Sequence, residues 1–480
     1  MLTLLSLSLA LGAAGCGPTW KNARIDGYKP GAGYRLETLK LGRGNSDETF
    51  VALCFSGGGT RAAALAFGVL EGLRATAIAP ADANSPPRTM LDEVDLISSV
   101  SGGSFTSMVY GLDREAIFDG RFERKFLKYN VQTRLLSLVL SPLSIVLLPY
   151  ALLDRIDLAA EYYHNEVFDR RTYQALLDRG ERPLLVVNAT NMSIDGRFEF
   201  TQDDFDFLGS DLASLPVAHA VAASSAVPLL LSPLRLSYQN SDVIERMMRE
   251  TLDQQATEPV DPRYRKWARS LLPQDAEAEG GPVRFDAAKH KFLYLLDGGL
   301  IDNLGVTHVL HSFRYGALRR MIAERRVRRL CVVIVNASTA APEPIEDQPR
   351  APGLWMMALK TGTIGISGLS EAMTEALRDV IQDRPRELGE WYDRCQGAMA
   401  KDCPKAPPPP QPAGTDVETQ VIEINFHRIA DAKKRRRFLS MPTSLFLQPG
   451  DVDALIDLGR QQLIEDPGYR LFVEQSRDAE

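Results

Sequence analysis

The sequence has few of the residues on which metal and nucleic-acid chemistry depends. Six histidines and five cysteines occur among 480 residues, with no HExxH motif and no CxxC pair, so the common zinc and redox signatures are missing. Lys and Arg number 55 against 62 Asp and Glu, and the net charge of −7 opposes binding to a phosphate backbone. No solenoid-type repeat is evident. We therefore expect no metal, no cofactor and no nucleic-acid partner.

What is present is the composition of an ordinary globular protein. Hydrophobic residues make up 45% and charged residues 24% of the chain, which excludes both wholesale disorder and a polytopic membrane protein. The length allows about three domains, or one large α/β domain with insertions.

The residues before Lys21 carry no charged side chain and resemble an export signal. The apolar run from Leu2 to Ala14 is too short to span a bilayer but suits a secretory signal. It ends in Ala-Ala-Gly-Cys at positions 13–16, which resembles a bacterial lipoprotein signal with Cys16 as the lipidated residue. We expect residues 1–15 to be a signal peptide and residues 16–47 a lipidated tether. A plainly cleaved signal and a buried hydrophobic arm are the alternatives.

Gly17 and the remaining cysteines indicate which cellular compartment the protein occupies. Gly17 in place of Asp favours, by the same resemblance, anchorage in the outer membrane of a bacterial envelope, facing the periplasm. Cys54 and Cys331 lie in apolar runs and are expected to be buried in strands. Cys395 and Cys403 lie beside a Pro-rich stretch. In an oxidising compartment we expect them to form a local disulfide rather than a metal site or a catalytic pair.

Short apolar runs alternate with helical patterns along the chain. The run 50–55 is followed by a turn and by helical spacing over 62–75, and the run 94–100 by a turn and helical spacing over 104–112. Further buried strands are expected at 182–192 and 329–338. Such alternation predicts a mostly parallel sheet covered by helices on both faces. An amphipathic helix is expected over 452–466.

A glycine loop separates the first apolar run from its helix. Gly57, Gly58 and Gly59 are followed by Thr60 and Arg61. Consecutive glycines leave backbone N–H groups pointing into open space at a helix N-terminus, which suits a phosphate or the oxyanion of acyl transfer. The loop has neither the Lys-Ser/Thr pair of a P-loop nor GxGxxG spacing. Taken alone, it is equally well explained as a tight structural turn.

A serine occupies the next strand-to-helix corner. Ser101 is followed by Gly102 and Gly103 and fills the centre of a GxSxG-like sequence, with Ser99 in place of the first glycine. Small neighbours permit the strained turn that lifts a nucleophilic hydroxyl clear of the sheet. A serine that caps the following helix is the alternative interpretation.

An aspartate ends the apolar strand predicted over 292–296. Asp297 precedes Gly298 and Gly299, and a side chain at the carboxyl end of a strand faces the crevice in which open α/β sheets bind ligands. Taken alone, the Asp-Gly pair is ordinary turn chemistry, and Asp302 and Asn303 are expected to form a similar turn before the next helix.

Together these motifs resemble the patatin-like phospholipase family, which is related to the cytosolic phospholipases. The family pattern has, in this order, a GGGxR oxyanion loop, a GxSxG nucleophile elbow and a DGG or DGA aspartate. Residues 223–228, Ala-Ser-Ser-Ala-Val-Pro, match a fourth segment of the family. The resemblance covers roughly residues 50–340. It implies a patatin-like three-layer α/β/α fold with a mostly parallel central sheet and helical insertions, and a lipid acyl hydrolase that requires no metal.

The resemblance also implies a role for each motif residue. Ser101 would be the nucleophile and Asp297 its base, in a dyad rather than a triad. The oxyanion hole would be formed by N–H groups of four glycines: Gly57, Gly58, Gly59 and Gly102. Arg61 would support the loop or pair with a phosphate head group, and a helix-face ion pair is the alternative. Three histidines are expected to pack or cap rather than to act as a base: His219, His308 and His311.

The resemblance places the domain boundaries as well. We expect residues 48–340 to form the catalytic domain, with insertions at about 130–160 and 240–290, and residues 341–480 to form a C-terminal extension that contains a Pro-rich loop. For the uncharged run Leu135–Leu153 we expect a membrane-facing lid or buried core. A transmembrane span is a third alternative, which the length of the run allows but its two prolines oppose. The basic stretches 314–329 and 433–437 either meet anionic lipid or are solvated helix faces.

The expected function is therefore a serine acyl hydrolase that cleaves fatty-acyl esters of phospholipids at a membrane surface, to which its lipid anchor holds it. A serine esterase or acyltransferase that acts on other acyl esters is one alternative. A non-catalytic envelope lipoprotein that binds lipid in the same crevice is another, and the presence of both Ser101 and Asp297 favours the enzyme.

Overall fold

The computed structural model describes residues 21–42, 44–78, 88–139, 155–227, 231–253, 259–273, 283–339, 368–402 and 414–478. The predicted signal peptide, Cys16, Cys403 and most of the Pro-rich loop lie outside these ranges. Of the apolar run Leu135–Leu153, only the beginning is described, as the end of α4 (Val131–Val139). Within these ranges, no helix combines the length and the apolar character that a membrane span requires.

An eight-stranded sheet forms the middle layer of the molecule. Its strands follow the order β12 (Glu418–Asn425), β11 (Arg329–Asn336), β2 (Thr49–Phe55), β5 (Val94–Val100), β6 (Leu184–Asn191), β10 (Phe292–Asp297) and β9 (Leu234–Ser237), and β7 (Gly196–Glu199) pairs with β6 beside this path. The strands from β12 to β6 are parallel. Strands β10, β9 and β7 pair antiparallel with their neighbours. The prediction of a mostly parallel sheet is confirmed.

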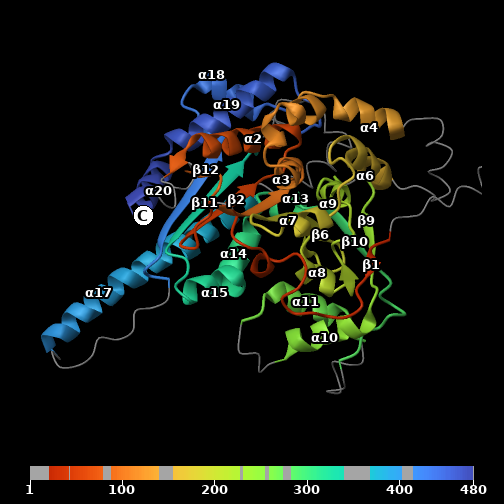
Figure 1. The fold of residues 1–480 in the computed structure, drawn as a ribbon, viewed down its shortest axis with the longest axis horizontal. Coiled ribbons are helices and arrows are strands. Elements are labelled where there is room, and N and C mark those ends of the chain that lie inside the picture. Colours follow the sequence, from red (N-terminus) through yellow and green to blue (C-terminus); the bar gives the residue numbers. More distant parts are fainter. Residues whose placement is uncertain are drawn as a thin grey trace, which may run out of the picture.

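Helices cover both faces of the sheet (Figure 1). One face carries α2 (Thr60–Ala75), α3 (Gly102–Leu112) and α19 (Pro449–Glu465), and the other carries α14 (Val306–Tyr315) and α15 (Ala317–Ala323). Right-handed crossovers place α2 and α3 on one face together, because they connect β2 to β5 and β5 to β6 in the same direction across the sheet. The result is the predicted three-layer α/β/α fold.

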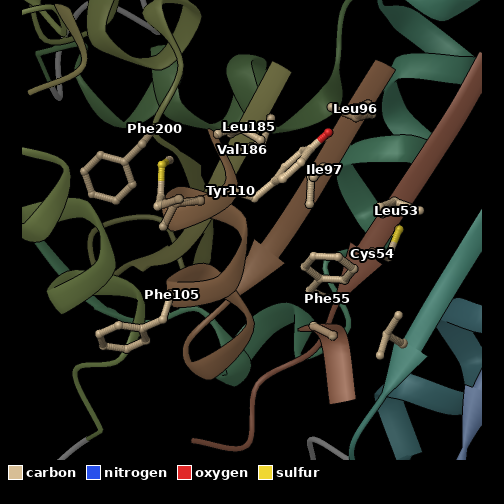
Figure 2. Close-up of a cluster of buried hydrophobic side chains, with 14 of the residues drawn as sticks. Leu53, Cys54, Phe55, Leu96, Ile97, Phe105, Tyr110, Leu185, Val186 and Phe200 are labelled. Atoms are coloured by element: carbon tan, nitrogen blue, oxygen red, sulfur yellow. The ribbon is translucent and has the colours of Figure 1, made fainter. Parts of the chain in front are cut away.

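The core lies between the central strands and the helices on either side. All seven residues of β2 and all seven of β5 are buried, as expected for parallel strands that helices cover on both faces. Figure 2 shows side chains of β2, β5, β6 and α3 gathered in one cluster, which includes Phe55, Ile97, Tyr110 and Val186. This rigid layer fixes the carboxyl ends of β2 and β5, where the glycine loop and Ser101 follow.

The remaining elements surround this framework. The helices are α6 (Arg155–Glu166), α7 (Gln174–Arg179), α8 (Gln202–Asp206), α9 (Val217–Ser224), α10 (Ser241–Leu252), α11 (Pro262–Ser270), α13 (Gly299–Asp302), α17 (Arg384–Asp402), α18 (Ala432–Leu439) and α20 (Pro467–Asp478). Two small antiparallel pairs are formed by β1 (Ala23–Arg24) with β8 (Ser210–Asp211) and by β3 (Ala77–Ile78) with β4 (Arg88–Thr89). Helices α10 and α11 lie within 240–290, where the sequence predicts an insertion.

Residues 21–42, which belong to the predicted tether 16–47, contact the rest of the fold. Strand β1 pairs with β8, and Tyr34 is almost fully buried, with its hydroxyl oxygen accepting a hydrogen bond from the N–H of Leu185 at 2.9 Å. Arg35 forms ion pairs with Asp203 and Asp206. Single anchoring side chains thus hold a segment in which the sequence shows little periodicity.

The C-terminal region is likewise part of the central framework. Strand β12 pairs with β11 in parallel over its whole length. Helix α19 packs against α2 so closely that a Cβ atom on Gly68 would lie 2.0 Å from the carbonyl oxygen of Ile456. The boundary predicted at residue 340 therefore does not mark the edge of the central sheet.

Helix α17 changes what the predicted disulfide would require. Cys54, Cys331 and Cys395 form no disulfide with one another, and Cys403, the predicted partner of Cys395, lies outside the described ranges. By Asp402 the helix has risen about 10 Å from Cys395, whereas the Cα atoms of a disulfide lie within about 7 Å of each other. The disulfide stays a prediction, and it requires the chain to turn back directly after the helix or the last helical turn to open.

Candidate active site

The glycine loop occupies the turn between β2 and α2 and can be built only from glycine. Gly58 and Gly59 have positive φ angles of 139° and 62°, which residues that carry a side chain rarely adopt. A Cβ atom on Gly59 would lie 2.2 Å from the carbonyl oxygen of Ser444. That same oxygen accepts a hydrogen bond from the N–H of Thr60 at 2.9 Å. The loop is thus pressed against the segment that precedes α19.

The N–H groups of the loop divide into occupied and available donors. The Gly57 N–H donates to the carbonyl oxygen of Asn303 at 2.9 Å, so this amide is not available to a ligand and its predicted place in the oxyanion hole is withdrawn. Among the described residues, no acceptor bonds the N–H of Gly58, Gly59 or Gly102. A Cβ atom on Gly102 would lie 2.1 Å from the Gly59 carbonyl oxygen, so the loop and the start of α3 meet backbone against backbone.

Ser101 stands at a strained corner between β5 and α3. Its φ and ψ angles are 48° and −117°, a conformation that non-glycine residues adopt at a cost and chiefly at functional sites. The backbone N–H of Ser101 donates to the Ser224 hydroxyl at 2.8 Å. The N–H of Gly103 donates to the carbonyl oxygen of Ser56 at 3.2 Å. The corner is therefore held from both sides.

Asp297 ends β10 in a buried position next to Ser101. One of its carboxylate oxygens accepts a hydrogen bond from the Gly299 N–H at 2.8 Å. Burial raises the pKa of Asp297 to about 7, and hydrogen bonds from Gly299 and the Ser101 side chain lower that pKa only in part. A carboxyl group with a pKa near neutrality can both accept and return a proton at physiological pH.

Ser224 supports the site in a way that the sequence pattern alone does not reveal. Its hydroxyl donates to the carbonyl oxygen of Asn188 at 2.6 Å while accepting from the Ser101 N–H. Its own carbonyl oxygen accepts from Gly298, and that of Ala226 accepts from Asp297, both at 3.2 Å. The segment 223–227 thus joins the Ser101 corner to the Asp297 turn. The only signal in the sequence is the family-like Ala-Ser-Ser-Ala-Val-Pro, whose Pro228 lies outside the described ranges.

Ser99, the departure from the GxSxG pattern, is accommodated inside the fold. Its side chain is fully buried. The hydroxyl lies 2.8 Å from that of Ser107 on α3 and donates to the carbonyl oxygen of Val186 on β6 at 3.2 Å. These partners satisfy the hydroxyl, so a serine at this position leaves the corner intact.

Arg61 holds the glycine loop against two distant segments. Its guanidinium donates to the carbonyl oxygen of Ala337 at 2.8 Å, to that of Met441 at 2.6 Å and to the Thr443 hydroxyl at 3.1 Å. Burial lowers the pKa of Arg61 to about 10, and no carboxylate partner is found among the described residues. The structure therefore favours loop support over a helix-face ion pair.

The three histidines lie apart from this machinery. His308 contacts Glu199 at 2.8 Å and His311 contacts Asp261 at 2.6 Å, both through Nδ1. Burial lowers the pKa of His219 to about 4. In the described part of the chain, neither the predicted nucleophile nor its predicted base bonds a histidine. The described ranges also hold no cluster of three or more His, Cys, Asp or Glu side chains suited to a metal ion.

Asp302 has the structural role that the sequence predicts for it. Its carboxylate accepts hydrogen bonds from the N–H groups of Leu304, Gly305 and Thr307 at 3.1, 2.9 and 2.7 Å. These bonds cap the start of α14. Asp302 therefore orders the turn after Asp297 and does not take part in the site itself.

Comparison with known proteins agrees with this geometry. A family model described as "Patatin-like phospholipase" matches residues 53–310, more than half of the chain. Among curated proteins, none matches the sequence.

Solved structures give distant matches. Human GIVD cytosolic phospholipase A2 matches with 13% identity and a TM-score of 0.43 over 90% of this chain and 61% of that one. The same human protein in complex with methyl gamma-linolenyl fluorophosphonate matches with 14% identity and a TM-score of 0.40, over 90% of this chain and 60% of that one. VipD from Legionella pneumophila matches with 12% identity and a TM-score of 0.28, over 86% of this chain and 67% of that one. The chain thus spans about three fifths of the cytosolic phospholipase chains it matches.

Proposed function

The chain belongs to the patatin-like phospholipase family, and on that premise we propose that it is a serine acyl hydrolase that cleaves fatty-acyl esters of phospholipids through a Ser101–Asp297 dyad. One observation carries the proposal. A serine at a strained strand-to-helix corner lies beside a buried aspartate whose pKa burial raises to about 7, and the Ser101 side chain is among the groups that lower this pKa in part. The available N–H groups of the glycine loop lie at the same corner.

The first half of the reaction forms an acyl-enzyme. Asp297 accepts the hydroxyl proton of Ser101 as the oxygen attacks the ester carbonyl carbon, because a serine hydroxyl is a weak nucleophile until a base takes its proton. The carbonyl oxygen becomes an oxyanion, which the N–H groups of Gly58, Gly59 and Gly102 stabilise. When the intermediate collapses, the carbon–oxygen bond to the alcohol breaks, and protonated Asp297 gives its proton to the departing alcohol oxygen.

The second half returns the enzyme to its starting state. Asp297 accepts a proton from a water molecule, whose oxygen attacks the acyl carbon and forms a second oxyanion in the same site. Collapse breaks the bond to Ser101, and the proton on Asp297 returns to the serine oxygen as the fatty acid leaves. Each half moves one proton onto Asp297 and one off it, which a carboxyl pKa near 7 favours.

The decisive experiment removes each dyad member in turn. Ser101→Ala and Asp297→Asn should each abolish hydrolysis of phospholipid vesicles, and the double variant should be little worse than either single one, because the two residues act as a unit. A fluorophosphonate probe should label Ser101 in the wild-type protein. Replacing His219, His308 or His311 should leave most of the activity in folded protein, which separates a dyad from a triad.

The same experiment decides between the alternatives. If the probe labels nothing in folded protein, or if Ser101→Ala keeps full hydrolysis, the catalytic proposal is wrong and lipid binding in the crevice takes its place. Mass spectrometry of the vesicle products separates hydrolysis from acyl transfer, since free fatty acid requires water as the acceptor. Activity on short-chain esters without any on phospholipids would favour a general esterase.

The anchor is a further part of the proposal. Ala-Ala-Gly-Cys at residues 13–16 supports lipidation at Cys16 and attachment to a bacterial outer membrane, facing the periplasm. Metabolic labelling with a fatty acid should mark the wild-type protein but not Cys16→Ser, which should be released when membranes are washed. A Cys16→Ser variant that stays as tightly bound as the wild type would mean that another segment holds the protein to the membrane.

A further inference from the structure

A basic pocket lies at the antiparallel end of the central sheet, away from the Ser101 corner. It encloses about 540 Å³ between β9, the start of β10 and the start of α10. Its lining includes three cations, Lys21, Arg235 and Lys291, and the rings of Phe285 and Phe292. Among the described residues that line the pocket there is no carboxylate.

The three cations have no acidic partner in the described part of the chain, and two neighbouring acids contact other groups. Asp286 pairs with Lys289 at 3.4 Å, and Glu245 accepts a hydrogen bond from the Phe285 N–H at 3.1 Å. Three positive side chains that line one cavity without forming an ion pair favour an anionic ligand.

The basic stretch 314–329, which the sequence offers as a lipid contact, differs in this respect. Four of its arginines form ion pairs within the protein: Arg320 with Glu37, Arg325 with Asp416, Arg326 with Asp47, and Arg328 with Glu48. These pairs support the interpretation of that stretch as a solvated, ion-paired face.

Exposed apolar side chains adjoin the pocket on the same face of the sheet. Phe292 and Tyr294 are each 42% exposed and alternate along β10 with buried leucines. Arg235 is paired in register with Tyr294, and its guanidinium lies 4.9 Å from the centre of the Phe292 ring. Met192 is 47% exposed, and its N–H donates to the Tyr294 carbonyl oxygen at 3.1 Å. Aromatic and cationic side chains together are typical of a membrane–water interface.

The position of this surface relates it both to the active site and to the N-terminal segment. Strand β10 leads from Phe292 at the pocket to Asp297 at the site, a distance of about 17 Å along the strand. Asn22 bonds both the N–H and the carbonyl oxygen of Ser237 at 2.8 Å, which fixes the neighbouring Lys21 at the pocket. Cys16, the proposed lipidation site, precedes Lys21 by a few residues.

We propose that this surface docks the protein on a bilayer that contains anionic phospholipids. Lys21, Arg235 and Lys291 bind the phosphates of the head groups, and Met192, Phe292 and Tyr294 enter the interfacial region. The proposal goes beyond the hydrolase activity and does not depend on it, because docking requires no reaction at Ser101.

Vesicle binding of the full chain tests the proposal, with Cys16→Ser in every sample so that a lipid anchor cannot mask the effect. The protein should sediment with vesicles of phosphatidylcholine mixed with phosphatidylglycerol far more than with phosphatidylcholine alone, and added salt should weaken binding. Arg235→Gln with Lys291→Gln should weaken it roughly 25-fold, since each cation near an anionic surface contributes roughly fivefold.

A charge-matched control variant separates a local surface from net charge. Arg394→Gln with Lys401→Gln removes the same two charges from α17, which extends from the opposite side of the molecule to β1 and β9 (Figure 1), and should leave binding almost unchanged. Phe292→Ser with Tyr294→Ser should weaken binding to both kinds of vesicle. Circular dichroism and the thermal midpoint verify folding for all variants without reference to catalysis.

Three results would overturn the proposal. Equal binding of the Arg235/Lys291 variant and the α17 control would mean that no local surface exists. Equal binding to neutral and anionic vesicles would exclude head-group recognition. Saturable binding of inorganic phosphate that prevents vesicle binding would assign the pocket to a free anion. Loss of docking with unchanged hydrolysis of a soluble ester would support the surface, whereas inactivity of the wild type towards every ester would count against the hydrolase alone.

Discussion

At the residue scale, burial gives Asp297 both its proposed chemistry and a cost in stability. The folded chain holds the carboxyl pKa near 7, against an ordinary value of 3.8. Between these two pH values the folded state keeps a proton that the unfolded chain has released. Its contribution to stability is therefore fully present below about pH 4 and is lost as the pH rises through 7.

The Asp297→Asn variant should reveal this linkage. Asparagine does not titrate, so the free energy of unfolding of the variant should rise relative to the wild type by roughly 2–3 kcal/mol between pH 5 and pH 8. Denaturant unfolding at both pH values measures the difference. A difference that does not change with pH would show that the carboxyl group of Asp297 has an ordinary pKa.

Ser224 offers a second test at the same scale. Ser224→Ala removes the hydroxyl that accepts from the Ser101 N–H and donates to the Asn188 carbonyl oxygen, so the nucleophile should lose its alignment. We expect kcat to fall about tenfold or more, with KM little changed, since a small misplacement of a reacting group is costly.

The matched control for that variant is the next residue in the chain. The Ser225 hydroxyl donates to the Val221 carbonyl oxygen of its own helix at 2.7 Å, so Ser225→Ala should keep most of the activity. Equal losses in the two variants would mean that the effect is general destabilisation rather than support of Ser101.

At the element scale, the site is formed where the start of one helix meets the loop before another. Gly102 begins α3, and Gly59 precedes α2. Their backbones approach too closely for any side chain at position 102. The contact keeps the available N–H groups of the loop next to Ser101, as transition-state stabilisation by preorganised donors requires.

Gly102→Ala should therefore reduce catalysis without touching the dyad. A methyl group 2.1 Å from the Gly59 carbonyl oxygen forces the loop away from α3, and the loss of one well-placed oxyanion donor lowers kcat by about 10²–10³. Gly450→Ala on α19 is the control, because nothing lies within 4 Å of the added Cβ atom. Rates near wild type for Gly102→Ala would exclude the glycine loop from the oxyanion hole.

At the scale of the whole molecule, the glycine loop depends on a part of the chain far beyond the matched family region. Met441, Thr443 and Ser444 bond Arg61 and Thr60 at the start of α2. Helix α19, which follows this segment, packs on α2 through glycines on both helices, and a Cβ atom on Gly459 would lie 2.4 Å from the Leu65 carbonyl oxygen.

Gly459→Val should separate the two helices and weaken both the fold and the site. Overpacking of this kind typically costs about 1–3 kcal/mol, so we expect a lower thermal midpoint and slower ester hydrolysis. Gly397→Val on α17 is the matched control, since its Cβ atom would meet nothing within 4 Å. Normal stability of Gly459→Val would mean that α19 is not tightly docked on α2.

The sequence by itself determined the elements and the order of the motifs. Apolar runs such as 50–55 and 94–100 become buried strands because their side chains must leave water on both faces of a covered sheet. Glycines at 57–59 and 102 mark positions where a side chain would clash or where the backbone has a positive φ angle. Ser101 follows directly on β5, and Asp297 ends β10. These properties are local, so the composition and spacing of a few neighbouring residues are enough to predict them.

Only the tertiary structure decided which of those residues meet and what surrounds them. Each contact that builds the site joins residues far apart in the chain. Strand β12 pairs with β11, and Arg61 bonds Ala337 and Met441. The Ser101 N–H bonds Ser224, and the Gly57 N–H bonds Asn303. The raised pKa of Asp297 has the same origin, because desolvation depends on everything packed around a group. Spacing along the chain carries no record of such contacts, since they arise only when the sheet register and the helix packing are set.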